Sequence, residues 1–281
     1  MTEIKAIDGL ILRPKALGKS KEKAVEAEKA IGKGGLLQLF PESADRQKDM
    51  TPEELVAEMD KAGVEKGLLN IRRPEDLEWV MEAIKKYPGK FIFCGVRFYP
   101  ITQGIMNELR RLKDLMNKCP FQSIRVAGWE LGVPCTDSRL FPFYTFAIEH
   151  DLKVSIPIGY PGPAGLARNQ DPLYVDEICY LFPELKVIQS HPGHPWTDVA
   201  IQNVIKYPNC YLKTNAFRPK YLPPELIQNL NTRAQDKIIW ASEYPLISFK
   251  DSLDDVRNLP IREPVRRKYL RDNLLRLFKF E

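Results

Sequence analysis

Short apolar runs rich in β-forming residues alternate with segments of helical periodicity, and this alternation constrains the fold more than any other feature. The runs cover residues 4–12, 67–71, 91–98, 123–126, 153–158, 186–189, 210–214 and 237–241. Most are continuously apolar, as is typical of parallel strands covered on both faces. The rhythm predicts an α/β fold, a (β/α)8 TIM barrel that forms a single domain over residues 1–281.

An open, doubly wound sheet is the alternative, because the order of strands along a chain does not show whether the sheet closes. No GxGxxG or GxxxxGK[ST] motif follows any of the runs, so the nucleotide-binding versions of the open sheet lose support. The barrel is therefore the favoured architecture.

Helix boundaries are clearest around residues 51–63. The tetrapeptide Thr51-Pro52-Glu53-Glu54 predicts a capping box with proline at the first helical position, and Gly63 predicts the C-terminal stop. A further helix is expected from Pro74, and the last one over residues 265–278, with basic residues outside and leucines inside.

The segment 13–49 is irregular, and its part 19–33 mixes Lys, Glu and Ala without a long apolar stripe. Loops after barrel strands border the site, so this segment is interpreted either as a lid or as a solvated insertion.

Charge and composition restrict the partners. The 281 residues include 42 Lys+Arg and 37 Asp+Glu, which gives a net charge of +5. Charges of both signs are therefore mixed on the surface, and this does not favour a nucleic-acid partner. No apolar run approaches the roughly 20 residues of a membrane span, and residues 1–5 lack the apolar stretch of a signal peptide. We expect a soluble, cytoplasmic protein with neither a nucleic-acid nor a membrane partner.

The five cysteines contain no CxxC pair, and the smallest gap, from Cys119 to Cys135, is 16 residues. This spacing predicts reduced, structural thiols.

Polar residues at the predicted C-terminal ends of strands are few, and function in barrels lies at these ends. The candidates are Asp8, Arg97, Tyr99, Arg125, His191, His194, Trp196, Lys213 and Glu243. The chain has three histidines, and two of them stand in the loop after the run 186–189. Here His191 suits proton transfer or metal binding, although a histidine that satisfies backbone groups is the alternative. The third, His150, is expected to cap a helix C-terminus.

Glu243 follows a buried apolar run, where an unpaired charge is costly, so it either pairs with a cation or does acid–base work. The cations Arg97, Arg125 and Lys213 would converge on one cavity and favour a small anionic, carboxylate-bearing substrate. The alternative is that they form ion pairs with Asp8 and Glu243.

Several motifs taken together resemble the amidohydrolase-related family of TIM-barrel enzymes, which includes metal-dependent decarboxylases and a pyrone dicarboxylate lactonase. They are Ile7-Asp8, Ser190-His191-Pro192-Gly193, Ala241-Ser242-Glu243-Tyr244-Pro245 and the terminal 273–278. The order and spacing of these motifs span nearly the whole chain. The resemblance implies a barrel with its site at the strand ends.

The chain departs from this family at its metal ligands. The two histidines of the family's Asp-x-His-x-His motif are Leu10 and Leu12, the histidine that ends the fifth strand falls on Pro157, and the aspartate after the eighth strand is Glu243. Of the family's ligand histidines, the one after the sixth strand is kept, as His191. A catalytic zinc takes three or more protein ligands, so we expect no cofactor and disfavour zinc.

Two main hypotheses follow. The first is a metal-independent hydrolase of a lactone or other acyl compound, with His191 and Glu243 catalytic. The substrate would then be bound by the remaining candidates, which are Asp8, Arg97, Tyr99, Arg125, His194, Trp196 and Lys213. A decarboxylase or other lyase is a variant of this hypothesis. The second is an inactive barrel that binds a ligand or a partner. The fold is also compatible with a homodimer.

Overall fold

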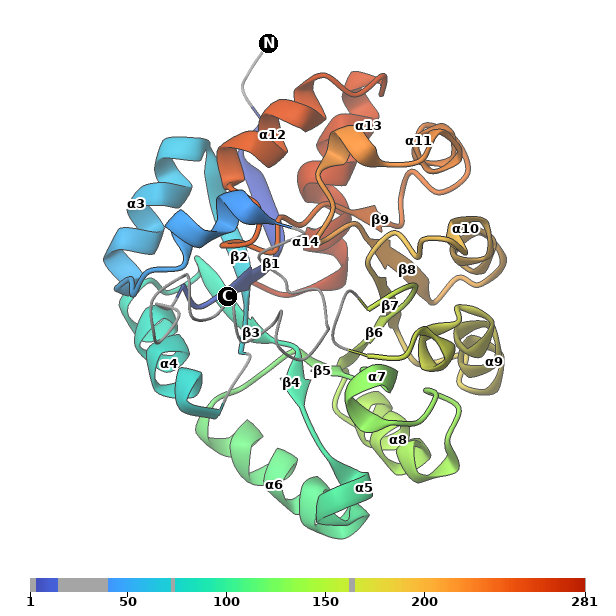
Figure 1. Ribbon diagram of the computed structural model, residues 1–281. Coiled ribbons are helices and arrows are strands. Elements are labelled where there is room, and N and C mark those ends of the chain that lie inside the picture. The colour runs from blue at the N-terminus through green and yellow to red at the C-terminus, as the bar shows by residue number, and fades with distance from the viewer. Residues whose placement is uncertain (1–3, 15–39, 72–73, 162–164, 281) are drawn as a thin grey trace.

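The structure is a computed structural model that describes residues 4–14, 40–71, 74–161 and 165–280. Parallel strands surround a central axis and helices form the outer layer (Figure 1). The strands are β1 (Ala6–Leu12), β2 (Val64–Asn70), β3 (Phe91–Cys94), β4 (Val96–Arg97), β5 (Ser123–Arg125), β6 (Lys153–Pro157), β7 (Val187–Ser190), β8 (Cys210–Lys213) and β9 (Ile238–Ile239).

The helices follow the strands in alternation, as predicted. They are α3 (Pro52–Ala62), α4 (Leu77–Lys86), α5 (Pro100–Gln103), α6 (Ile105–Lys118), α7 (Gly128–Leu131), α8 (Phe141–Glu149), α9 (Leu173–Leu181), α10 (Thr197–Lys206), α11 (Pro224–Leu230), α12 (Phe249–Arg257), α13 (Glu263–Arg267) and α14 (Asn273–Leu277). Short 3-10 turns include Pro41–Arg46 and Pro74–Asp76.

The sheet closes, which excludes the open alternative. The order β1-β2-β3 continues through β4-β5-β6-β7-β8-β9, and every pair is parallel. The last strand meets the first where Gly9 N–H donates to Trp240 O (3.2 Å) and Leu12 N–H donates to Tyr244 O (2.8 Å). The predicted TIM barrel is therefore confirmed.

The predicted third strand, 91–98, is divided into β3 and β4 at Gly95, which has φ +66°. A Cβ atom on Gly95 would lie 1.8 Å from Asn70 Oδ1 on the neighbouring β2, so the side chain of Asn70 fills the space that any other residue would need. Glycine is required here by both the backbone angle and this close approach.

The start of α3 has the predicted capping box. Thr51 Oγ1 accepts from Glu54 N–H (3.3 Å), the Glu54 carboxylate accepts from Thr51 N–H (2.8 Å), and Gly63 ends the helix at φ +83°. The helix after β2 begins with the 3-10 turn at Pro74, and His150 caps the C-terminus of α8, both as expected.

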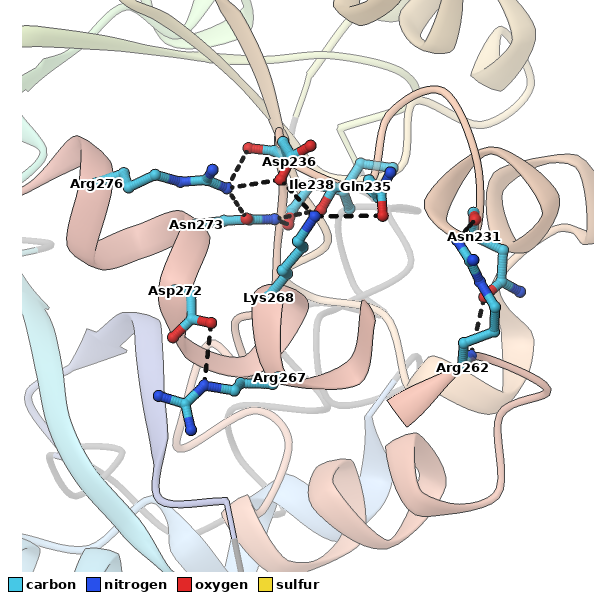
Figure 2. A network of polar contacts seen from close by, with 10 residues as sticks. All are labelled: Asn231, Gln235, Asp236, Ile238, Arg262, Arg267, Lys268, Asp272, Asn273 and Arg276. Atoms are coloured by element: carbon cyan, nitrogen blue, oxygen red, sulfur yellow. Dashed lines mark hydrogen bonds and ion pairs between the residues drawn. The ribbon is translucent and has the colours of Figure 1, made fainter. Parts of the chain in front are cut away.

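The predicted last helix, 265–278, is instead α13 and α14 joined by a π-helical turn, Lys268–Asp272. Polar contacts tie this segment to the start of β9 (Figure 2). Asn273 Nδ2 donates to Gln235 O (2.9 Å) and Ile238 O (2.7 Å), and Asp236 pairs with Lys268 (2.9 Å) and Arg276 (3.1 Å). The C-terminal segment is thus fastened to the strand that closes the barrel.

One layer of the barrel interior includes residues from the C-terminal segment. Side chains of β1, β2, β3, β7 and β9 pack with Leu274, Leu277 and Phe278 in one buried cluster. Next to it, Gln122 exchanges two hydrogen bonds with the main chain of Lys279. The C-terminal segment therefore covers the end of the barrel opposite to the C-terminal ends of the strands.

All five cysteines are buried and free, as predicted. Within the described residues, no helix is long and apolar enough to cross a membrane. Most of the segment interpreted as a lid or insertion, 13–49, lies outside the described residues.

Candidate active site

Three neighbouring strands end in residues with left-handed backbone angles. His191 after β7 has φ +74°, Ala216 after β8 has φ +61°, and Glu243 after β9 has φ +58°. Such angles cost a non-glycine residue roughly 1–3 kcal/mol and cluster at functional sites. Their concentration at the C-terminal edge of the barrel marks this edge as the candidate active site.

Asn215, the residue after Thr214 at the end of β8, connects the two predicted catalytic residues. Its Oδ1 accepts from the hydroxyl of Ser190 (2.8 Å) and from His191 N–H (3.1 Å). Its Nδ2 donates to Glu243 Oε2 (2.7 Å) and lies 3.1 Å from His191 Nδ1. Both predicted catalytic side chains are therefore held against one carboxamide.

Burial lowers the pKa of His191, and the Glu243 carboxylate acts against this shift. The positive charges of Arg125 and Lys213 lower the pKa further. A lowered pKa keeps the ring neutral at neutral pH, the state in which a nitrogen accepts a proton.

Asp8 is fully buried and binds across the closing seam of the barrel. Its carboxylate accepts from Leu10 N–H (2.9 Å), from Ser242 N–H (3.1 Å) and from the Ser242 hydroxyl. Burial raises its pKa from 3.8 to about 7, although these hydrogen bonds and the nearby Lys213 oppose the shift.

Lys213 ends β8 with its ammonium group inside the barrel, 3.4 Å from Gly9 O. A Cβ atom on Gly9 would lie 3.2 Å from Lys213 Cδ, so the absence of a side chain there makes room for the lysine stem. Burial lowers the Lys213 pKa to about 8, while the neighbouring Glu243 and Asp8 charges raise it. The ammonium is therefore buried beside β1 and under the influence of the Glu243 and Asp8 charges.

Arg97 and Arg125 are paired in register on β4 and β5, and both contact Glu130 Oε1 at 3.3 Å. The sequence interpretation proposed ion pairs with Asp8 and Glu243 as the alternative to substrate binding, and it did not include Glu130. This carboxylate, on the short helix α7, balances one of the two guanidinium charges.

The other predicted residues lie on the loops. Tyr99 is 38% exposed and precedes α5, and its N–H donates to Glu108 Oε2 (3.0 Å). The exposed His194 accepts from Tyr160 N–H through its carbonyl (3.0 Å), and Trp196 stacks on Tyr160 with ring centroids 5.9 Å apart. The contacts described for these three residues are to helix α6 and to the loop at Tyr160, and none is to His191, Asn215 or Glu243.

The loop that carries Glu243 is held by the 3-10 turn Pro41–Arg46. Arg46 donates to Pro245 O (2.9 Å) and to Leu246 O (2.6 Å), and Leu246 N–H donates back to Glu243 O (2.9 Å). This turn belongs to the described part of the segment 13–49, which is residues 13–14 and 40–49.

The residues present do not fit the metal site that the resemblance implies. Leu10 and Leu12 are buried in one apolar cluster with Ala241, and such side chains offer no ligand atoms. Within the described ranges, no group of three or more His, Cys, Asp or Glu residues is placed to hold a metal ion. We derive no chemistry through a metal here.

Three residues of the site were not among the candidates predicted from the sequence, namely Asn215, Ser242 and Glu130. Asn215 and Ser242 each stand one residue before a left-handed position at a strand end, and Ser242 lies inside the motif Ala241-Ser242-Glu243-Tyr244-Pro245. Glu130 carried no local signal, because its role depends on two strands coming together.

A sequence model of the amidohydrolase family matches residues 26–280. The chain belongs to the amidohydrolase family. A comparison with curated proteins finds no match. Among solved structures, the chain is similar to an uncharacterised TIM-barrel protein from Bordetella bronchiseptica, with 25% identity, a TM-score of 0.77 and 97% of both chains covered.

Two further similar structures show the shared fold. One is 5-carboxyvanillate decarboxylase LigW from Sphingomonas paucimobilis, with 16% identity and a TM-score of 0.68. The alignment covers 99% of the present chain and 100% of that chain. The other is a probable 2-pyrone-4,6-dicarboxylic acid hydrolase from Acinetobacter baumannii with citric acid bound, with 15% identity and a TM-score of 0.61. The alignment covers 97% of the present chain and 98% of that chain.

Proposed function

We propose that this protein hydrolyses a lactone or other activated acyl compound that carries a carboxylate, without a metal ion. The observation that carries the proposal is the unit of His191, Asn215 and Glu243 beside the cations Arg125 and Lys213. A neutral imidazole next to fixed positive charge suits a reaction in which a water is deprotonated and an oxyanion develops.

Each residue of the site has its own role in the reaction. Arg97, Arg125 and Lys213 hold the substrate carboxylate, with Glu130 fixing the two arginine side chains. His191 Nε2 takes a proton from a water, whose oxygen forms the new bond to the acyl carbon. Lys213 stabilises the oxyanion, the bond to the leaving oxygen breaks, and His191 returns the proton to that oxygen.

The fold relatives support the carboxylate class, because their names include a dicarboxylic acid hydrolase and a decarboxylase of a carboxylated aromatic acid. Decarboxylation is the second candidate, favoured by the same cations. It differs from hydrolysis in its product, since it releases CO2 and needs a proton delivered to carbon.

The test is a substrate panel that includes 2-pyrone-4,6-dicarboxylate and 5-carboxyvanillate, followed by ultraviolet absorbance and by CO2 release. The enzyme is assayed after chelator treatment and again with added zinc or manganese. We expect hydrolysis of the pyrone or a related lactone, at a rate that neither treatment changes. Activity that requires the added metal would overturn the proposal.

Variants connect the activity to the site. Removal of a general base costs about 10²–10⁴-fold in rate, so His191→Ala should reduce kcat by this amount. His150→Gln is the matched control, because this exposed histidine caps α8 away from the strand ends. Binding of the panel compounds without turnover would instead indicate a ligand-binding barrel.

A further inference from the structure

The orientation of the Asn215 carboxamide is determined by its partners. Oδ1 faces two groups that only donate here, the hydroxyl of Ser190 and the main-chain N–H of His191. A flipped amide would set its NH2 group against the N–H donor and its oxygen against the Glu243 carboxylate. Nδ2 therefore points towards Glu243 and His191 Nδ1.

His191 Nδ1 consequently has two partners of opposite character, and both belong to Asn215. The main-chain oxygen of Asn215, at 3.2 Å, accepts a hydrogen bond when Nδ1 carries the proton. The side-chain Nδ2, at 3.1 Å, donates one when Nδ1 is bare. A neutral imidazole has its proton on either Nδ1 or Nε2, so each tautomer finds a partner without moving the ring.

We infer that Asn215 is a positioning residue that holds the His191 ring in one orientation through both neutral tautomers and connects it to Glu243. The inference rests on the proposed function, in which His191 exchanges protons at Nε2. The tautomer protonated on Nδ1 presents a bare Nε2 as a base, and the other presents an N–H as an acid. One histidine can then start a reaction in either role.

Nitrogen NMR of protein with 15N-labelled histidine tests this without a substrate. The chain has three histidines, so His150→Gln and His194→Gln variants assign the His191 signals. In the wild type we expect both ring nitrogens of His191 to resonate between the protonated and bare positions, because the tautomers exchange. A wild-type spectrum with a single fixed tautomer would overturn the inference.

Asn215→Leu keeps the shape of the side chain and removes its polar atoms, which leaves the main-chain oxygen as the partner of Nδ1. We expect the Nδ1 signal to move to the protonated position and the Nε2 signal to the bare position. Asn107→Leu, the same change at an exposed position on α6, should leave the spectrum unchanged.

Asn215→Asp is the second variant and covers the case in which the leucine variant does not fold. An aspartate still accepts from Ser190 and His191 N–H, but it places an oxygen where Nδ2 meets His191 Nδ1 and Glu243. The expected result is again a proton fixed on Nδ1. Wild-type ring signals in either folded variant would contradict the inference.

The outcomes separate this inference from the proposed function. An enzyme inactive on the whole panel would still show the tautomer shift if Asn215 positions the ring. If the panel reveals activity, Asn215→Leu should lower kcat with little change in KM, since the residue contacts His191 rather than the substrate.

Discussion

Asp8 and Ser242, which are 234 positions apart in sequence, are joined by the Ser242 N–H and hydroxyl groups donating to the Asp8 carboxylate. This contact lies beside the seam at which β9 returns to β1. It therefore links closure of the barrel to the loop that carries Glu243.

Ser242→Ala removes one donor to Asp8 and the acceptor for Tyr244 N–H (2.9 Å). A buried carboxylate that loses a hydrogen bond is destabilised by about 1–3 kcal/mol. We expect a loss of this size in the free energy of unfolding, measured by urea denaturation at pH 7. Ser138→Ala, at an exposed serine in a 3-10 turn, should have no comparable effect, and an equal loss there would argue against the assignment.

Protonation of Asp8 should make the free energy of unfolding depend on pH. Its folded pKa, about 7, exceeds the unfolded value of 3.8, so the folded state binds more protons between these pH values. Stability therefore falls as pH rises from about 4 to 7, by an amount on the order of 4 kcal/mol. Asp8→Asn should abolish this decline in urea titrations at several pH values, whereas Asp198→Asn, at an exposed site, should retain it.

Lys213 has the opposite effect at higher pH. Its folded pKa of about 8 lies below the ordinary lysine value of 10.5, so the unfolded state binds more protons between these values. Stability should rise as pH increases from about 8 towards 10.5, which places a minimum near pH 7–8 when combined with Asp8. A Lys213→Met variant that still gains stability over this range would contradict the prediction.

The same Lys213→Met variant should weaken binding of a carboxylate ligand such as 2-pyrone-4,6-dicarboxylate. A hydrogen bond to a charged group contributes about 1.5–3 kcal/mol, which corresponds to roughly 10–150-fold in Kd by calorimetry. Lys153→Met is the matched control, because this equally buried lysine lies at the first residue of β6, at the opposite end of the barrel. Equal affinity in the two variants would exclude a role for Lys213 in binding.

The fold could be predicted because its signals are local. The capping box at Thr51 and the stop at Gly63 depend on residues within one helix, and both were confirmed. The division of the third strand depends on Asn70 of a neighbouring strand filling the space beside Gly95, which no local pattern reveals.

The candidate site was predictable in part for the same reason. A polar residue directly after a buried strand can be placed at the mouth of a barrel, and the structure places His191 and Glu243 on the same carboxamide of Asn215. The charges of Arg125 and Lys213 act on the pKa of His191. Their roles remain predictions. The partners of Arg97 and Arg125 could not be foreseen, because Glu130 reaches them only after β4 and β5 have paired.

One end of the barrel can be covered only late in the synthesis of the chain, because the C-terminal segment covers it. All strands leave the ribosome before Leu277 and Phe278, yet these two side chains belong to the same buried layer as residues of β1 and β2. A nascent chain can pair its strands but leaves that end of the barrel open to water until this segment emerges. We therefore expect a released chain truncated after residue 262 to be protease-sensitive, although it already contains every residue of the candidate active site.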